Sequence, residues 1–521
     1  MTAQPSQQNF AIDDFLHRQE QKGLLRLIAC GSVDHGKSSL LGRLLYEAKP
    51  LLDDQLATLE SDTRRHGGKD GELDYSLLLD GLTAEREQKI TIDVAYRFFS
   101  TDKRKFIIID APGHEQYTRN MATGASNADL ALILIDAESG FTAQTRRHSL
   151  LVSMLGVRRI VVAVNKMDLV GWSQQRFAEI EREFRSFARD FDVDNVVVIP
   201  LSARAGDNVV RRSTNMRWYG GPTLLEHLEN VSITPKRTDS ALRMPVQWVN
   251  RPDANFRGYS GTIAGGVARP GQRVHLLPSG QSAQISRIVT ADGDLAEARS
   301  GQAVTITLTT EVDASRGDVI VADTNPPPVA SEVDARIFWM GSAALTPSRR
   351  LIVRAGTAQA GAHIARDLSV VDLGTLETRP AMALSVNEIG DGRIVFDRPL
   401  AIERYAENAD LGGFILIDPE TNNTVALGLI TQAVAQKENW VDTAKRLYET
   451  GAVAARRRRS FAKALSWRVI GSLSTFALAW IITGNLMLAS SIVAAEIAAK
   501  TAFYYLHERA WSLVSWGWPA R

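Results

Sequence analysis

A glycine-rich stretch near the start of the chain, GSVDHGKS at 31–38, limits the possible folds more than any other feature of the sequence. It follows an apolar run at 24–30 that is typical of a buried strand, and it precedes SSLLGRLLYEA, which has helical periodicity. In this context G-x-x-x-x-G-K-S is a phosphate-binding loop, because its glycines let consecutive backbone N–H groups and a helix N-terminus point at phosphate oxygens. The sequence therefore predicts an α/β domain that binds a nucleotide.

The side chains of this loop have separate expected roles. Lys37 would reach the β and γ phosphates and take part in catalysis, and the Ser38 hydroxyl would ligate Mg²⁺. The residues expected to bind the nucleotide in this part of the chain are Gly31, Ser32, Val33, Asp34, His35, Gly36, Lys37, Ser38 and Ser39.

Three further motifs follow in order, each at the end of a predicted strand. Asp110-Ala111-Pro112-Gly113 follows KFIII, which brings Asp110 to the outer coordination sphere of Mg²⁺ and the Gly113 N–H to the γ phosphate. Asn165-Lys166-Met167-Asp168 follows IVVAV, and a carboxylate there can accept two hydrogen bonds from guanine, whereas adenine offers no such pair of donors. Ser202-Ala203, after VVVIP, adds a backbone N–H for guanine O6. These motifs predict GTP as the nucleotide.

Two more residues are candidates for the hydrolysis step. Thr91, in EREQKITI at 85–92, is the candidate switch threonine whose hydroxyl completes the Mg²⁺ coordination only when a triphosphate is bound. The alternative is an ordinary strand threonine. His114 comes directly after D-x-x-G and could orient the attacking water, since phosphoryl transfer needs positioning more than covalent help. The alternative is an ordinary surface histidine.

The pattern of strands predicts several domains. Apolar strands separated by helix-compatible segments, as far as about residue 231, predict a mostly parallel sheet covered on both faces. Short strands with Gly, Pro and Asp turns then predict two all-β barrel domains, joined by a stiff proline linker at 326–328. The expected organisation is a flexible N-terminus (1–23), a P-loop GTPase domain (24–235), β-barrel domain 2 (236–328), β-barrel domain 3 (329–435), a basic connector (436–460) and a helical, membrane-like domain (461–515).

Composition narrows the cellular context. The 521 residues carry a net charge of +1, which argues against a wholly basic nucleic-acid binder, and we expect no nucleic-acid partner. The single cysteine excludes an intramolecular disulfide and a cysteine zinc cluster, which suits the reducing cytoplasm. The N-terminus has no basic run followed by an apolar stretch, so no secretory signal is expected.

The C-terminal part of the chain differs from the rest. Residues 469–495 contain no charged side chain, and about 20 apolar residues suffice to cross a bilayer. Two helices meeting near 484–485 would form a hairpin, and the arginines at 456–459 would keep its ends in the cytoplasm. Glu496 and Lys500 could pair within the hairpin. The alternative is a buried soluble hairpin or an oligomer interface. The expected location is the inner face of the cytoplasmic membrane, with attachment through 461–515.

The motifs are similar to those of a known family. A GTPase with DAPGH, an E-R-x-x-x-I-T-I switch and two following β domains resembles the translation elongation factor superfamily. DGLTAEREQKITIDVAYRFF at 80–99, QTRRHS at 144–149 and VQWVNRPDANFRGYSGTIAGG from 246 resemble, more narrowly, the GTP-binding large subunit of bacterial sulfate adenylyltransferase. This likeness extends over about 24–434. The tail resembles a small, uncharacterised bacterial membrane domain.

The resemblance implies a role in sulfate assimilation. In this family ATP and sulfate give adenylyl sulfate and pyrophosphate, GTP hydrolysis drives the uphill reaction, and adenylyl transfer takes place on a separate small subunit. GTP, Mg²⁺ and that small subunit, in a heterodimer or larger assembly, are therefore the expected ligands and partner. No second G-x-x-x-x-G-K-[ST] follows residue 434, so no adenylyl-sulfate kinase activity is expected.

One departure from the family keeps other hypotheses open. Lys89 stands where the family usually has glycine, and the backbone angles that glycine permits are costly for lysine, so the coupling of the switch is in question. A membrane-anchored regulatory GTPase that has lost this coupling is one alternative. A translation-type GTPase that binds charged tRNA is another.

Overall fold

The structure is a computed structural model that describes residues 22–48, 63, 73–79, 91, 93–233, 240–253, 256–347, 349–434 and parts of 475–491. Residues 80–90, 456–459, 496 and 500, which enter the sequence predictions, lie outside the described residues. The chain divides into two compact units, which are Met1–Leu277 with Gln281–Lys437, and Pro278–Gly280 with Glu438–Arg521.

The first domain is built on a six-stranded sheet with the order β2-β3-β1-β4-β5-β6. Every predicted strand is present, and the sheet is parallel except for β2, which pairs antiparallel with β3 at the edge. The strands are β1 (Gly23–Gly31), β2 (Ala95–Ser100), β3 (Arg104–Asp110), β4 (Leu130–Asp136), β5 (Arg159–Asn165) and β6 (Asn195–Pro200). The sequence predictions did not include β2, whose residues Tyr96 and Phe98 are exposed although apolar.

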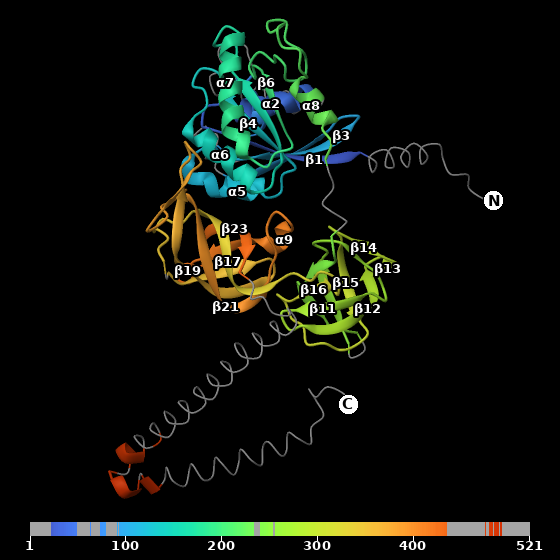
Figure 1. Ribbon diagram of the computed structural model, residues 1–521, viewed down its shortest axis with the longest axis vertical. Helices are drawn as coiled ribbons and strands as arrows, with labels where there is room; N and C mark the ends of the chain where they lie inside the picture. The colour runs from blue at the N-terminus through green and yellow to red at the C-terminus, as the bar shows by residue number, and fades with distance from the viewer. Residues whose placement is uncertain are drawn as a thin grey trace, which may run out of the picture. The chain divides into compact units, whose positions relative to one another are not determined.

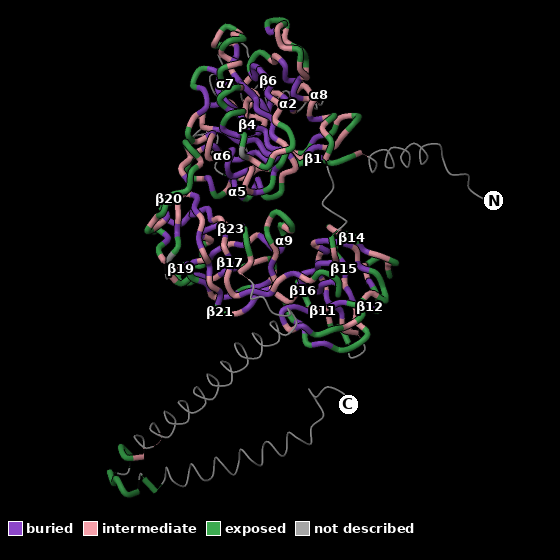
Figure 2. Tube along the Cα trace, viewed as in Figure 1, coloured by how far each residue is buried: buried purple, intermediate pink, exposed green. Residues whose placement is uncertain are grey.

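Helices cover both faces of this sheet, as predicted (Figure 1). On β4 the side chains alternate, so that Ile133 belongs to the core beneath α5, α6 and α7, and Leu132 belongs to the core beneath α2 and α8. All seven residues of β4 are buried, and Figure 2 shows the buried trace running through the centre of the domain. The helices are α2 (Lys37–Ala48), α5 (Thr118–Ala125), α6 (Ala143–Met154), α7 (Gln174–Phe187) and α8 (Leu224–Asn230), with 3-10 turns η1 (Tyr75–Leu78), η2 (Glu115–Tyr117) and η3 (Ala188–Asp190).

The second domain is a β structure with the strand order β7-β16-β11-β12-β15-β9-β8. Because β7 pairs with β16 and β8 pairs with β9, the short segment that contains both β7 and β8 closes the sheet on itself. The strands are β7 (Arg243–Pro245), β8 (Trp248–Asn250), β9 (Gly258–Thr262), β10 (Val267–Ala268), β11 (Arg273–Leu277), β12 (Gln281–Thr290), β13 (Gly293–Asp294), β14 (Ala298–Arg299), β15 (Ala303–Leu308) and β16 (Val319–Ala322).

The third domain is a closed barrel. Its order is β18-β22-β23-β17-β21-β19-β20, and an additional pairing of β18 with β19 closes a ring of six strands. The elements are β17 (Val329–Trp339), β18 (Leu351–Ala355), β19 (Ala358–Val371), β20 (Thr378–Pro380), β21 (Ile389–Ala401), helix α9 (Ala409–Gly412), β22 (Gly413–Ile417) and β23 (Thr424–Ala433). The two predicted β-barrel domains are therefore present.

In the second unit, the described residues around 484 form a break between helical segments. Gly484 has φ 64°, and its N–H donates to the carbonyl of Trp480 at 2.9 Å. The Asn485 side chain then accepts from the N–H groups of Met487 (3.0 Å) and Leu488 (3.4 Å). A left-handed glycine that ends one helix and an asparagine that caps the next are the expected chemistry of such a break. The predicted break at 484–485 is confirmed.

Apolar side chains of this unit are open to solvent. Ile481 and Met487 are 77% and 83% exposed. Among the described residues, the structure contains no helix that combines the length and the apolar character needed to span a bilayer.

Candidate nucleotide site

The phosphate-binding loop connects β1 to α2, as predicted. Gly31 (φ 148°) and Gly36 (φ 83°) adopt backbone angles that favour glycine, and Asp34 (φ 62°) also lies in the left-handed region. At Gly31 a Cβ would meet the carbonyl oxygen of Leu134 at 2.6 Å, so the loop has no room for a side chain there. His35 is buried, and its Nδ1 contacts the Leu134 carbonyl at 3.0 Å. The loop is thus fixed by backbone contacts with β4.

Lys37 is buried at the centre of this loop. Its ammonium donates to the carbonyls of Gly31 (3.0 Å) and Ser32 (2.9 Å). Burial lowers the pKa of Lys37, whereas the charge of the nearby Asp110 acts in the opposite direction. The ammonium therefore lies inside the loop, where phosphate oxygens would be its natural partners.

The D-x-x-G segment lies directly against this lysine. Asp110 ends β3 and is 2% exposed. A Cβ built on Gly113 would come within 2.3 Å of Lys37 Nζ and 2.8 Å of the Gly31 carbonyl oxygen. The structure therefore brings these two motifs together, as expected from parallel strands whose carboxyl ends share one edge.

The N-K-x-D and Ser-Ala motifs meet behind the same loop. Asn165 is buried, its amide donates to the His35 carbonyl at 2.9 Å, and its oxygen accepts from the Ala203 N–H at 2.9 Å. Ser202 is buried too, and its hydroxyl accepts from the N–H of Ala205 at 3.1 Å. Asn165 therefore connects the phosphate-binding loop to the loop expected to contact guanine.

Lys166 and Asp168 flank the expected guanine position. Lys166 has φ 61°, and its ammonium forms a 2.7 Å ion pair with Asp136 at the end of β4. Burial acts to raise the pKa of Asp136, but the hydrogen bond and charge of Lys166, together with hydrogen bonds from the N–H groups of Glu138 and Ser139, hold it below its usual range. Asp168 is half-buried. The sequence predictions did not include Asp136, although an acidic residue at a strand end, like Asp110, is a recognisable signal.

Thr91 and His114 lie at the two candidate switch segments. Thr91 is half-buried and precedes β2, and its role as the switch threonine stays a prediction. His114 Nδ1 accepts from the N–H of Gln116 at 3.2 Å and caps η2. Because Nδ1 is used as an acceptor, a neutral His114 has its proton on Nε2, which leaves an N–H to orient a water molecule.

Helix α6 contributes groups that the sequence predictions did not single out. Thr142 caps it and contacts the Ser32 hydroxyl at 3.3 Å. Within the helix, the fully buried His148 reaches the phosphate-binding loop, and Gln144 reaches the D-x-x-G segment. The available signal was the phrase QTRRHS, in which Gln144 and His148 are spaced i,i+4 and so lie on one face of a helix.

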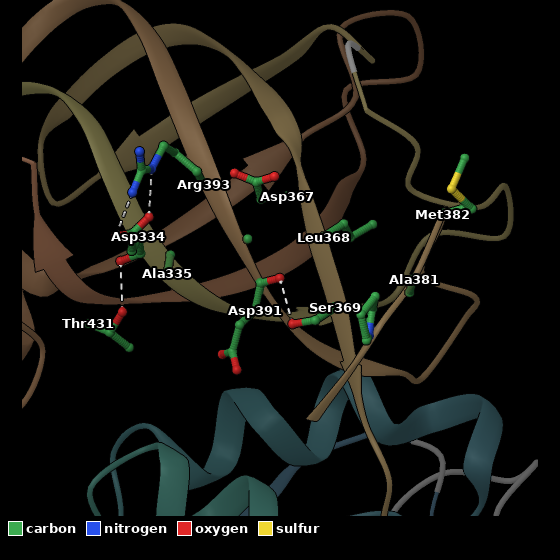
Figure 3. A pocket seen from close by; sticks show the side chains of 12 residues that line it. Asp334, Ala335, Asp367, Leu368, Ser369, Ala381, Met382, Asp391, Arg393 and Thr431 are labelled. Carbon is green, nitrogen blue, oxygen red and sulfur yellow. Dashed lines mark hydrogen bonds and ion pairs between the residues drawn. The ribbon is translucent and has the colours of Figure 1, made fainter. Parts of the chain in front are cut away.

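A second hollow, of about 600 Å³, lies on domain 3 (Figure 3). Its lining includes the bidentate ion pair of Arg393 with Asp334 (2.8 and 3.1 Å), and the lining residue Asp391 pairs with Arg336 outside it (2.8 and 3.0 Å). Met382, at its rim, is 88% exposed. The lining residues include none of the predicted nucleotide-binding residues, so this hollow is separate from the nucleotide site.

This fold is that of a GTP-binding domain of the elongation factor Tu type. Residues 22–234 match the family "Elongation factor Tu GTP binding domain", and 332–431 match "GTP-eEF1A C-terminal domain-like". Residues 461–512 match "Predicted membrane protein (DUF2061)".

Individual relatives define the family more narrowly than these domain families do. The chain is 52% identical over 438 residues to sulfate adenylyltransferase subunit 1 of Methylorubrum extorquens, and the aligned region covers 84% of this chain and 93% of the relative. It is 49% identical over 426 residues to the subunit of the same name from Aeromonas hydrophila, covering 82% and 90%. It is 50% identical over 428 residues to the bifunctional enzyme CysN/CysC of Xylella fastidiosa, covering 82% and 69%. The chain belongs to the sulfate adenylyltransferase subunit 1 family.

Proposed function

We propose that this chain is the GTP-hydrolysing subunit of a sulfate adenylyltransferase, in which hydrolysis of GTP drives the formation of adenylyl sulfate and pyrophosphate from ATP and sulfate. The observation that carries the proposal is the 52% identity over 438 residues to a sulfate adenylyltransferase subunit 1. The geometry of the site supports the GTPase part, because all the nucleotide motifs meet at one edge of the sheet.

In this proposal the site divides the work between its residues. Lys37 and the N–H groups of residues 31–39 bind the phosphates, and the carboxylate of Asp168 selects guanine, assisted by the backbone at Ser202 and Ala203. Asn165 holds the two loops together through its contacts with His35 and Ala203. Lys166 is oriented by Asp136 at 2.7 Å.

Mg²⁺ fits the donor set at the phosphate end. Ser38 offers a hydroxyl at the start of α2 and Asp110 provides a buried carboxylate, which are oxygen ligands of the kind that Mg²⁺ prefers, and the Thr91 hydroxyl would join them when a triphosphate is bound. The ion would neutralise charge that develops on the phosphates. His114 would orient the attacking water through Nε2–H, and Gly113 would detect the γ phosphate through its N–H.

The adenylyl-transfer step is assigned to a separate small subunit. This assignment extends the proposal and comes from the family resemblance. The test is to purify the full chain with its adenylyl-transferring partner and to measure adenylyl sulfate formed from ATP and sulfate, with and without GTP. Adenylyl sulfate that accumulates well beyond the GTP-free equilibrium supports the proposal. Equal yields with and without GTP contradict it and favour a regulatory GTPase, and copurification of charged tRNA instead of the partner favours the translation-type alternative.

We further propose that residues 461–515 attach the chain to the inner face of the cytoplasmic membrane. The family match at 461–512 and the exposed apolar side chains around the 484–485 break support this. The backbone in lipid must satisfy its own hydrogen bonds, so the segment would be helical on both sides of the break. The full chain should sediment with membranes, and a chain ending before residue 456 should not. A full-length chain found only in the supernatant would exclude attachment.

The topology of this attachment is a separate question. A hairpin keeps both ends in the cytoplasm, whereas a single span places Trp511 outside. Since Cys30 is the only native cysteine and can be replaced, Ser512→Cys provides a unique thiol. An impermeant thiol reagent applied to intact cells should leave this thiol unlabelled, and its labelling would contradict the hairpin.

A further inference from the structure

A buried imidazole on α6 lies against the phosphate-binding loop. His148 is 0% exposed, its Nδ1 lies 3.2 Å from the backbone nitrogen of Gly31, and its Nε2 lies 2.9 Å from the side-chain nitrogen of Gln144. Burial, together with the charges of Lys37 and Arg147, lowers the pKa of His148 to about 3. The ring is therefore neutral at physiological pH.

A neutral imidazole has one N–H donor and one acceptor nitrogen. Both neighbours of His148 present donors. The Gly31 N–H can only donate, and Gln144 turns its NH₂ toward the ring because its oxygen accepts from Arg147 Nη1 at 2.5 Å. His148 can accept from only one of them at a time, so the two contacts compete.

The competition defines two arrangements. With the proton on Nδ1, His148 accepts from Gln144, the Gly31 N–H is released toward the loop, and the Gln144 amide also reaches the Gly113 carbonyl at 3.4 Å. With the proton on Nε2, His148 accepts from Gly31, and the Gln144 amide must rotate to present its oxygen. That rotation breaks the contacts of Gln144 with Gly113 and Arg147.

The contacts that change lie at the γ-phosphate end of the site. Gly113 lies against Lys37, because a Cβ built on Gly113 would come within 2.3 Å of Lys37 Nζ. Arg147, the other partner of Gln144, forms a 2.7 Å ion pair with Glu115, two residues beyond Gly113. The pair of Gln144 and His148 thus connects the loop that would hold the β phosphate to the segment that would detect the γ phosphate.

We propose that Gln144 and His148 are a two-state positioning pair: the imidazole tautomer follows the occupant of the phosphate site, and the Gln144 amide transmits that state to the segment Gly113–Glu115. The proposal rests on guanine-nucleotide binding at this site. Neither residue touches the reacting atoms, so both act through the backbone of Gly31 and Gly113.

The first test observes the tautomer. The full-length chain is labelled with ¹⁵N-histidine, and long-range ¹H–¹⁵N spectra are recorded with GDP and with a non-hydrolysable GTP analogue. The chain has nine histidines, and the signal that disappears in His148→Gln identifies the ring. We expect the proton of the His148 ring to be on one nitrogen in the GDP complex and on the other nitrogen in the complex with the GTP analogue. The same tautomer in both would overturn the proposal.

The second test locks one state. In Gln144→Glu the carboxylate can only accept, from His148 and from Arg147, which fixes the proton on Nε2 with either nucleotide. We expect GDP affinity within about threefold of the parent, while the hydrolysis rate falls on the order of 10-fold to 10²-fold because Gly113 is mispositioned. Gln175→Glu, an exposed glutamine on α7, is the matched control and should leave both unchanged.

The outcomes separate this proposal from the proposed function. Failure of the parent chain to bind fluorescent GDP would remove both. The parent chain could bind GDP normally and form adenylyl sulfate in a GTP-dependent way, and yet keep the same His148 tautomer with both nucleotides while Gln144→Glu hydrolyses GTP at the full rate. That result would contradict only the proposal of a positioning pair and would leave the proposed function intact. If His148→Gln does not fold, the locked spectrum of Gln144→Glu identifies the ring instead.

Discussion

The two ends of the nucleotide site are built on different principles. The phosphate end is defined by backbone and by lack of space: Gly31 has φ 148°, and Gly113 has no room for a Cβ beside Lys37. The proposed guanine end is defined by side chains, with Asn165 joining two loops and the half-buried Asp168 as the proposed guanine acceptor. Changes at the first end should therefore alter chemistry, and changes at the second should alter selectivity.

The largest effect is expected from Lys37→Ala. It removes a buried ammonium that lies within the phosphate-binding loop and leaves the Gly31 and Ser32 carbonyls without their donor. GTP hydrolysis should become undetectable, a loss of at least about 10³-fold, because phosphoryl transfer depends on this charge. Phosphate-release kinetics measure it. The control is Lys103→Ala, whose exposed side chain pairs with Glu229. Hydrolysis near the parent rate in Lys37→Ala would refute the backbone-and-charge description of this end.

Gly113→Ala tests the steric part of the same description. Its Cβ would meet Lys37 Nζ at 2.3 Å and the Gly31 carbonyl at 2.8 Å, so the segment or the lysine must move. We expect hydrolysis to fall by about 10²-fold or more, since small misplacements near the reacting groups have effects of this size. Gly220→Ala is the control, because no atom lies within 4 Å of its Cβ position. Unchanged hydrolysis in Gly113→Ala would mean that the contact is not needed.

His114→Ala removes the candidate water-orienting group and keeps the loop. Binding of GTP, measured by titration of a fluorescent analogue, should remain, while hydrolysis slows on the order of 10²-fold. Part of any loss in stability would come from the η2 cap that His114 provides. His363→Ala, an exposed histidine on β19, controls for the loss of an imidazole. Normal hydrolysis in His114→Ala would remove its assigned role.

Asp168→Asn should give the smallest loss and the clearest change of selectivity. The amide replaces one acceptor by a donor, which suits the 2-oxo group of xanthine better than the amine of guanine. Loss of hydrogen bonds to a charged group of this kind corresponds to GTP binding about 10-fold to 10²-fold weaker, with a shift toward xanthosine nucleotides. Competition titrations with both nucleotides test this, with the exposed Asp192→Asn as control. An unchanged preference for GTP would show that Asp168 does not select the guanine base.

The sequence predicted the parts of the site that are local. Each motif combines a strand with the turn that follows it, so Asp110, Asn165 and Ser202 could be placed at one edge of the sheet from residue pattern alone. The contacts between α6 and the loop could not be placed in this way. Gly31 and His148 are 117 positions apart, and no pattern within either segment says that they meet.

The edge strand β2 is a second feature that the sequence pattern could not predict. Residues 95–100 contain two exposed aromatic side chains, so neither their apolar content nor their alternation indicates which face of the strand packs against the core. They form β2 because they pair with β3.

By itself, the sequence predicted the nucleotide class and determined the order of the domains and the break at 484–485, because each depends on short-range chemistry: glycine angles, strand ends and capping side chains. Only the tertiary structure decided that Lys37 faces Gly113, that Lys166 pairs with Asp136, and that His148 lies between two donors. Those contacts join residues that are distant in the chain, and they form only when packing of the helices on the sheet brings their backbones to within hydrogen-bonding distance.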